Sequence, residues 1–498
     1  MKKSTKILAL VLCAAMLIPM LVACGGKTKD PDDSQGGQTV YDGTPTSVPD
    51  DLTFEGETFT ILCRTDTPFG EYLYEIEADE NETEVVNQAV YERNLLVEER
   101  FGVDLIAHDV PGGWNDSTEF KNTFRNSTLA GSGAFDLIMG YQAYMCELGL
   151  TELYVNFYDI PYINEDINNV YFFQDNVEEL TVDGQIYFLV GDYCLTYFEY
   201  LYVMYFNKQI AKNENIEDLY QLVRDGEWTI DKAMELSKGV YRDLDGNGWV
   251  GDQDQFGYIT DYENTADAIF SFFDVQSTSH DEEGNIILDL DQGKMVSILE
   301  KMIAFYKTDD VFAHKTSSDD VDVPFDAIFT EDRALFYPER LEYAQKYRGM
   351  ETDFGIIPFP KWDTNQEKYY TQAQNAYSVA VVPLDAPDLE KTGAIFDVLS
   401  ALSYDLVTPA YYDMALKGKF ARDNESGEML DIIRDGICIN FGFFYNDDVG
   451  PAGAIRLLLH QENSNFVSYY AANQKGYQRN LKKVLKVYED RAAEENEQ

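Results

Sequence analysis

One stretch near the middle of the chain, residues 183–210, restricts most strongly what this protein can fold into. It reads DGQIYFLVGDYCLTYFEYLYVMYFNKQI. The pattern predicts an apolar strand at 186–190, a polar break at 191–192, and then a second strand-like run of aromatic residues ending near Phe206. Two such segments on either side of a short hinge indicate a chain that passes from one lobe to another. Aromatic residues that cannot all be buried are then expected near a cleft.

The length and charge of the chain limit its class. At 498 residues it is long enough for two sizeable cores. It is rich in aromatic residues, with 35 Tyr and 30 Phe, and its formal net charge is -51. A field of that sign repels phosphate backbones and anionic lipid headgroups. Nucleic acid is therefore not expected as a partner.

The N-terminus resembles a bacterial lipoprotein signal. Lys2, Lys3 and Lys6 precede an apolar run at 7–23, which ends in Leu-Val-Ala-Cys at Cys24. The resemblance implies that residues 1–23 are a signal peptide and that Cys24 is lipidated, for example by palmitate. A transmembrane anchor is the weaker alternative, because the run is shorter than the roughly 20 residues that a span needs. We expect an exported protein, anchored by lipid on the extracellular face of the cell membrane.

Residues 24–52 are Gly, Pro, Ser, Thr, Gln and Asp with few apolar residues, which predicts a flexible tether. Beyond the tether, Cys63, Cys146, Cys194 and Cys438 have wide and irregular spacing. This spacing does not indicate a disulfide framework or a metal ribbon.

The first part of the folded chain alternates strand and helix patterns. Such a βαβα rhythm predicts a parallel sheet covered by helices on both faces. The predicted segments are strands at 59–63, 103–107 and 135–139 and helices at 85–100 and 117–129. Further along, we expect strands at 201–206 and 256–260 and helices at 228–241 and 293–306.

The motif Gly-Gln-Ile-Tyr at 184–187, followed by Leu-Tyr-Val-Met-Tyr-Phe-Asn-Lys at 201–208, resembles the central signature of a protein family. That family is the extracellular solute-binding lipoproteins of ABC importers, in their carbohydrate-type, maltose-binding-protein-like branch (family 1). Residues 87–105 and 134–140 also resemble segments of it. The resemblance implies an α/β, two-lobe periplasmic-binding-protein-like fold of type II. Each lobe is then a mostly parallel sheet flanked by helices, and chain crossovers form the hinge.

The same resemblance implies where the lobes divide. The first lobe would comprise 53–190 and 338–376, and the second 191–337 and 377–498. Within these bounds, 325–338 resembles the return strand of the family, and 353–360 resembles a strand-then-proline segment of the first lobe. Residues 377–383 are expected to cross into the second lobe.

The segment 243–254 fits the spacing of a calcium-binding loop. Its oxygen ligands would come from Asp243, Asp245, Asn247, the carbonyl of Trp249 and Asp254. The last position is Asp rather than Glu, and no exiting helix is predicted. A structural Ca²⁺ is therefore expected here, and a metal-free turn of Asp, Asn and Gly is the alternative.

No catalytic constellation is visible in the sequence. The four histidines are isolated, and there is neither a GxSxG motif nor a phosphate loop. With 89 acidic residues, nearby carboxylate pairs arise by chance and do not indicate a glycosidase. We therefore do not expect an enzyme.

The aromatic residues fit sugar binding better, because sugars stack their C–H faces on rings and pair their hydroxyls with polar side chains. Clefts in such α/β sheets lie beyond the carboxyl ends of the strands. Taken singly, each ring is more simply a packing residue. The predicted ligand-binding residues are Arg64, Asp66, Tyr141, Tyr197, Glu199, Tyr337, Glu339, Asn375 and Tyr377, with Trp114 and Trp362 as weaker candidates.

The function implied is capture of an extracellular carbohydrate or oligosaccharide by a monomer, which closes on it and delivers it to ABC permease subunits. The alternatives are a binding protein for a peptide or another solute, a surface polysaccharide-active enzyme, and a sensory or adhesive lipoprotein with the same fold.

Overall fold

The computed structural model describes residues 43–65, 75–315, 325–412, 416, 424–445, 449–450 and 453–495. Gly43–Gln498 forms one compact unit separate from the preceding residues. The predicted signal peptide, Cys24 and the first part of the tether lie outside the described residues, as does Asp66. None of the described helices is both long and apolar enough to cross a bilayer.

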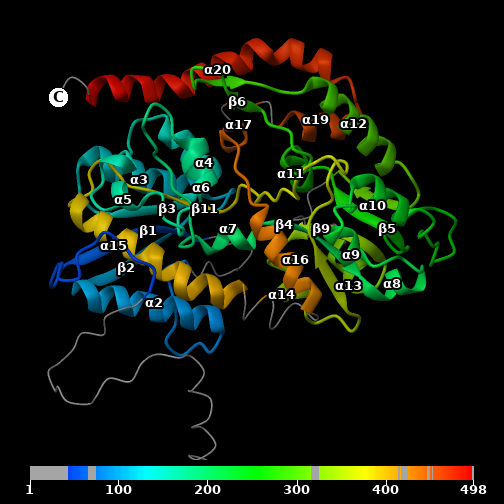
Figure 1. Ribbon diagram of the computed structural model, residues 1–498, viewed down its shortest axis with the longest axis horizontal. Coiled ribbons are helices and arrows are strands. Elements are labelled where there is room, and N and C mark those ends of the chain that lie inside the picture. The colour runs from blue at the N-terminus through cyan, green and yellow to red at the C-terminus, as the bar shows by residue number, and fades with distance from the viewer. Residues whose placement is uncertain are drawn as a thin grey trace, which may run out of the picture. The chain divides into compact units, whose positions relative to one another are not determined.

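The first sheet has the strand order β11-β3-β1-β2. β1 (Thr58–Thr65) pairs in parallel with β2 (Asp104–Pro111) and β3 (Leu137–Tyr141), whereas β11 (Ser378–Val381) runs antiparallel to β3. The connections are α2 (Val85–Phe101) and α3 (Ser117–Ala130). Figure 1 shows α2 and α3 on opposite sides of this sheet. The predicted βαβα rhythm is confirmed.

Local sequence explains where α2 begins and ends. The Glu84 side chain accepts hydrogen bonds from the amides of Val86 and Asn87, which caps the first turn. At the other end Gly102 adopts a left-handed conformation with φ of 69°, where glycine carries no Cβ penalty. The side of α2 that includes Val90, Val97 and Phe101 is buried.

The second sheet has the order β10-β4-β9-β5-β8. Its strands are β4 (Tyr202–Asn207), β5 (Phe256–Asp261), β8 (Val311–His314), β9 (Ala334–Arg340) and β10 (Phe354–Ile357). β5 is parallel to β8 and β9, whereas β4 is antiparallel to β9 and β10. A core that includes Trp228, Tyr258 and Phe336 packs around this sheet.

Shorter elements complete both lobes. A two-stranded sheet joins β6 (Thr278–His280) and β7 (Ile286–Leu288). The other helices of the described chain up to the return strand are α4 (Gln142–Gly149), α5 (Ile163–Asp166), α6 (Gln174–Leu180), α7 (Leu195–Glu199), α8 (Lys208–Asn213), α9 (Leu219–Arg224), α10 (Ile230–Ser237), α11 (Asn264–Phe272), α12 (Gln292–Tyr306) and α13 (Phe325–Thr330), with a 3-10 turn at Phe157–Asp159.

The helices after β9 begin with α14, before β10, and the others follow β11. They are α14 (Tyr343–Tyr347), α15 (Leu389–Leu402), a π-helical segment at Ser403–Val407, α16 (Asn424–Asp435), α17 (Phe441–Phe444), α19 (Ala454–His460) and α20 (Phe466–Glu495). α20 packs on α12 and β7. Near its end it contacts the segment after α4, where Arg491 Nη1 donates to Tyr154 O at 2.6 Å. Figure 1 shows this helix in red, next to the C-terminus.

Three predicted elements differ from the structure. Residues 186–190 form no regular strand and make an isolated bridge between Leu189 and Ala380. The helix predicted at 228–241 begins and ends inside those bounds, at Ile230–Ser237, because Gly239 turns the chain with φ of 80°. The segment predicted as a return strand at 325–338 is first a helix, and the strand starts at Ala334.

Two short strands lie in the opposite sheets from those predicted. β10, expected in the first lobe, pairs with β4 of the second sheet, and β11, expected in the second lobe, pairs with β3 of the first. Both are four-residue strands buried on both faces. Such a strand carries no alternation of apolar and polar residues that would tell the two sheets apart.

The predicted flexible tether ends earlier than expected. Residues from Gly43 onward are described, and Val48 is buried. Asp405 accepts hydrogen bonds from the amide and hydroxyl of Thr44 at 2.7 and 2.8 Å, and Arg100 Nη2 donates to Val48 O at 3.0 Å. The last ten residues of the predicted tether therefore belong to the folded unit.

Candidate binding site

The candidate site is built on the carboxyl edge of the first sheet. β1, β2 and β3 are parallel, so Arg64, Pro111 and Tyr141 lie at the same edge. β11 enters this edge from the crossover, and Ser378 pairs with Tyr141.

Arg64 is buried at the end of β1 and is held from two sides. Its Nε donates to Ser378 Oγ at 3.0 Å, and its Nη2 donates to the carbonyl of Ala376. Its guanidinium carbon lies 5.0 Å from the centroid of the Tyr141 ring, within cation–π range. The side chain is thereby fixed next to the last crossover.

Three aromatic rings lie beside Arg64 at this edge of the sheet. They are Trp114, Tyr141 and Tyr144, and we call them the aromatic platform. The Trp114 and Tyr141 centroids are 6.2 Å apart, and Tyr141 stacks on Tyr144 at 5.5 Å. Tyr141 and Tyr144 are buried, whereas Trp114 is 62% exposed. The platform therefore presents one open ring backed by two fixed ones.

The loop that carries Trp114 is tied to the platform. Tyr144 Oη donates to the carbonyl of Gly112 at 2.9 Å, and burial raises the Tyr144 pKa, so the hydroxyl stays protonated as a donor. A Cβ on Gly112 would lie 2.9 Å from Tyr144 Oη and 2.8 Å from Arg64 Cβ. Glycine is thus required for this close approach.

The rings predicted at the crossovers lie inside the protein. Tyr197 and Tyr377 pack edge to face at 4.7 Å, and Tyr197 also packs on Phe173. Both tyrosines are buried, and burial raises their pKa values. The structure brings this pair together, and their contact with a ligand stays a prediction.

The predicted residues at the return strand form a charged cluster. Tyr337 Oη donates to Glu339 Oε2 at 3.0 Å, and Glu339 Oε1 pairs with Arg340 Nε at 3.2 Å. Arg340 Nη1 donates to Gln374 Oε1 at 2.7 Å, which links the return strand to the next crossover. Glu199 and Asn375 are both half-buried. The carbonyl of Glu199 accepts from the amide of Glu342, and Asn375 directly follows Gln374 in the sequence.

Several residues of this arrangement were not predicted. Tyr144 lies three residues after Tyr141, and the spacing of a helix start could have revealed it. Arg340 directly follows the predicted Glu339. Ser378 and Gln374 carry no sequence signal, because only the pairing of β11 with β3 brings Ser378 to Arg64.

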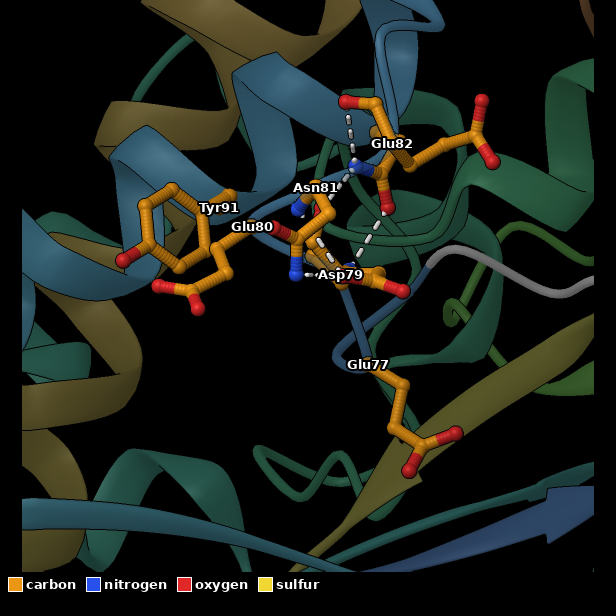
Figure 2. A pocket seen from close by; sticks show the side chains of 8 residues that line it. Glu77, Asp79, Glu80, Asn81, Glu82 and Tyr91 are labelled. Carbon is orange, nitrogen blue, oxygen red and sulfur yellow. Dashed lines mark hydrogen bonds between the residues drawn. The ribbon is translucent and has the colours of Figure 1, made fainter.

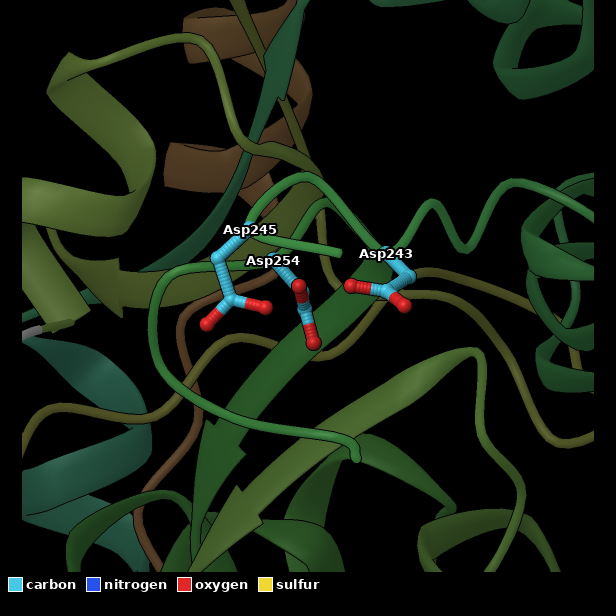
Figure 3. Close-up of side chains that lie close together, drawn as sticks. All are labelled: Asp243, Asp245 and Asp254. Carbon is cyan, nitrogen blue, oxygen red and sulfur yellow. The ribbon is translucent and has the colours of Figure 1, made fainter. Parts of the chain in front are cut away.

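The acidic loop gathers the carboxylates that the sequence predicted. One oxygen from each of Asp243, Asp245 and Asp254 lies within 4.8 Å of the others. Figure 3 shows the three side chains close together. Asp254 is buried and accepts from the amides of Leu244 and Gly251, both at 3.0 Å. Asn247 donates to Asp245 at 2.6 Å, and Trp249 is exposed. Hard oxygen ligands in this number fit Ca²⁺, and occupancy of the loop stays a prediction.

A cavity of about 640 Å³ lies at the start of α2 (Figure 2). Its lining is acidic and includes Glu77, Asp79, Glu80, Glu82 and the ring of Tyr91. Glu77 lies against Asp109, and burial together with this like charge raises the Asp109 pKa to about 6. The sequence had not singled out this cavity.

Neither a protein-family model nor a curated protein matches the sequence. Solved structures match over most of the chain. The galacto-N-biose/lacto-N-biose I-binding protein of an ABC transporter from Bifidobacterium longum, solved with lacto-N-biose, is 12% identical with a TM-score of 0.55, covering 87% of this chain and 98% of its own. A sugar transporter protein from Rhizobium etli in an open conformation is 12% identical with a TM-score of 0.53, covering 86% and 98%.

An ABC substrate-binding protein from Listeria monocytogenes, in complex with cycloalternan, is 12% identical with a TM-score of 0.51, covering 88% of this chain and 99% of its own. These identities establish a shared fold. The predicted α/β, periplasmic-binding-protein-like fold is confirmed, and its solved examples include sugar-binding proteins of ABC transporters.

Proposed function

We propose that this protein captures an extracellular carbohydrate on the aromatic platform and delivers it to an ABC permease. The observation that carries this proposal is Trp114, an indole 62% exposed to solvent that lies next to Tyr141, which stacks on Tyr144, at the carboxyl edge of the first sheet. A large exposed ring backed by rings suits the apolar face of a sugar. The fold supports the proposal, since its neighbours include sugar-binding proteins.

In this mechanism the platform holds the sugar and the charged cluster offers groups to its hydroxyls. Arg340 and Glu339 supply donors and acceptors at the return strand, which lies in the other sheet. A sugar that contacts both sheets binds the closed arrangement more tightly and shifts the population toward it. The ligand leaves chemically unchanged.

Two further parts of the proposal concern the cell surface and calcium. Lipidation at Cys24 would hold the protein at the membrane, where a permease could receive the ligand. Ca²⁺ bound by Asp243, Asp245 and Asp254 would fix a loop that follows α10, since their oxygens already converge. Its role would be structural.

The test is a thermal-shift screen of residues 43–498, which form a compact unit by themselves, against mono- and oligosaccharides, amino acids and peptides. A ligand at a hundred times its Kd adds about 2.7 kcal/mol of stability. We expect stabilisation by a sugar without turnover. Stabilisation by peptides alone, or hydrolysis of a glycan, would reject the proposal.

A matched pair of variants then assigns the site. Trp114→Ala should abolish the sugar-induced shift, because the open ring is lost. Trp249→Ala is the control, because Trp249 is also exposed, at 78%, but lies in the acidic loop. If both variants respond to the sugar as the unchanged protein does, the platform is not the site.

A further inference from the structure

The outer face of α20 differs in charge from the protein as a whole. The chain carries 89 acidic and 38 basic residues, yet the exposed face of α20 is basic over residues 475–486. Four of these exposed side chains, Lys475, Arg479, Lys482 and Lys483, are here called the basic stripe. The last three lie four, seven and eight residues after Lys475. Residues so spaced share one side of a helix.

The stripe is presented rigidly because the opposite face of the helix is buried. The buried side chains are Tyr470, Tyr477, Leu481, Val484 and Tyr488. Tyr488 Oη lies 2.6 Å from Tyr445 Oη, and Arg491 donates to Tyr154 O. The basic stripe therefore cannot turn inward.

The stripe is not neutralised by the protein itself. Among the carboxylates that the structure describes, none lies within ion-pair distance of the four side chains, and the nearby Lys486 pairs with Asp490. Some other exposed cations do pair with carboxylates, as Lys307 does with Glu462 and Lys346 with Asp326. In so acidic a chain, these four adjacent cations form a local positive surface that an anionic partner would complement.

We propose that the basic stripe docks this protein on an anionic phospholipid surface. The inference rests on the proposed function in one respect, the location at the outer face of the membrane. Three of the four side chains are Lys, which suits a diffuse anionic surface, whereas protein interfaces are depleted in Lys and use Arg and aromatic anchors. The neighbouring exposed residues Ala471, Ala472 and Gln478 carry no large apolar side chain that could insert into a bilayer. The expected contact with the lipid surface is therefore electrostatic.

The net charge of -51 does not forbid this contact. At physiological ionic strength charges are screened beyond about 8 Å, so the groups at the contact decide its sign. Residues 475–486 extend about 17 Å along the helix, enough to meet several headgroups. Such a contact would orient the folded unit relative to the membrane.

The experiment is co-sedimentation of residues 43–498 with vesicles of equal parts phosphatidylglycerol and phosphatidylcholine, or of phosphatidylcholine alone. This form lacks Cys24, so a lipid anchor contributes nothing. We expect binding to the anionic vesicles at 50 mM salt, loss of binding at 500 mM salt, and none to phosphatidylcholine.

Two variants with the same net charge complete the test. In the first, the four residues of the basic stripe are changed to Gln, which should weaken vesicle binding about fivefold per cation and several hundredfold in total. In the control, Lys212, Lys238, Lys307 and Lys346, which are exposed elsewhere, are changed to Gln. The control should bind as the unchanged protein does, and both variants should keep their melting temperature within a few degrees.

Equal binding by the two variants, binding to phosphatidylcholine, or no binding by the unchanged protein would each overturn the proposal. The assay contains no sugar. It can therefore fail while sugar binding stands, and sugar binding can fail while the stripe binds vesicles.

Discussion

The carboxyl edge of the first sheet carries rings, whereas that of the second carries charges. At the first edge, Tyr141 lies against the Arg64 guanidinium and is flanked by the rings of Trp114 and Tyr144. At the second, β5, β8 and β9 end at Asp261, His314 and Arg340, and Arg340 pairs with Glu339 and Glu342. The first edge exposes one ring, that of Trp114, whereas at the second edge the Arg340 guanidinium is held by two carboxylates. In the proposed mechanism the first edge supplies the stacking surface and the second supplies polar groups for the sugar hydroxyls.

The largest expected effect is on the charged edge. Arg340→Met should destabilise the protein by about 3–5 kcal/mol, because Glu339 and Glu342 would keep buried charges without this cation. Urea unfolding of residues 43–498 measures it. Arg224→Met, which breaks the surface pair with Glu428, is the control and should leave the midpoint nearly unchanged. Equal urea midpoints for the two variants would show that the charged cluster around Arg340 does not stabilise the protein.

The next effect concerns a buried acid that, unlike Glu339, makes no ion pair within the described chain. Asp397, on α15 beside the first sheet, accepts from Tyr171 Oη at 2.7 Å, and burial raises its pKa to about 8. The folded protein then binds this proton more tightly than the unfolded chain, so stability falls as pH rises from about 4 to about 8. Between pH 6 and 8 the loss is roughly 2–3 kcal/mol.

Asp397→Asn should remove this part of the pH dependence and make the protein more stable than the unchanged one at pH 8. Urea midpoints at pH 6, 7 and 8 test it. Parallel pH profiles for the two proteins would show that Asp397 is ionised in the fold.

A smaller effect is expected from the hydrogen bond that ties the Trp114 loop to the aromatic platform. Tyr144→Phe keeps the ring but removes the hydrogen bond to Gly112 O, which holds the loop of Trp114. We expect about 1 kcal/mol less stability and, for a sugar found in the screen, about fivefold weaker affinity by calorimetry.

Tyr154→Phe is the matched control for Tyr144→Phe. It removes a similar bond, from Tyr154 Oη to Met145 O at 3.0 Å, that does not touch the platform. Its stability should fall by a similar amount while its affinity stays unchanged. Equal sugar affinities for the unchanged protein and both variants would show that the loop of Trp114 does not contribute to binding.

The smallest expected effect is that of calcium on the second lobe. Adding Ca²⁺ should raise the melting temperature by a few degrees at most, and a chelator should reverse the shift. Asp245→Asn should weaken this response, because Asp245 is one of the three converging carboxylates. An identical melting temperature with Ca²⁺ and with chelator would identify a metal-free turn.

Sequence reasoning was most accurate where side-chain patterns are local. The helix predicted at 85–100 is observed at Val85–Phe101 and the strand predicted at 256–260 at Phe256–Asp261, because apolar periodicity within a few residues specifies them. The order of the motifs from residue 184 onward was enough to identify the fold, although no family model matches.

By itself, the sequence determined the two-lobe α/β class, the elements of the first sheet and the spacing that draws Asp243, Asp245 and Asp254 together. Only the tertiary structure decided which sheet β10 and β11 join, how Ser378 meets Arg64, and that Tyr197 and Tyr377 turn inward. The reason is physical. Local patterns fix which residues face a core, but pairing between strands far apart in the chain depends on contacts that no short window contains.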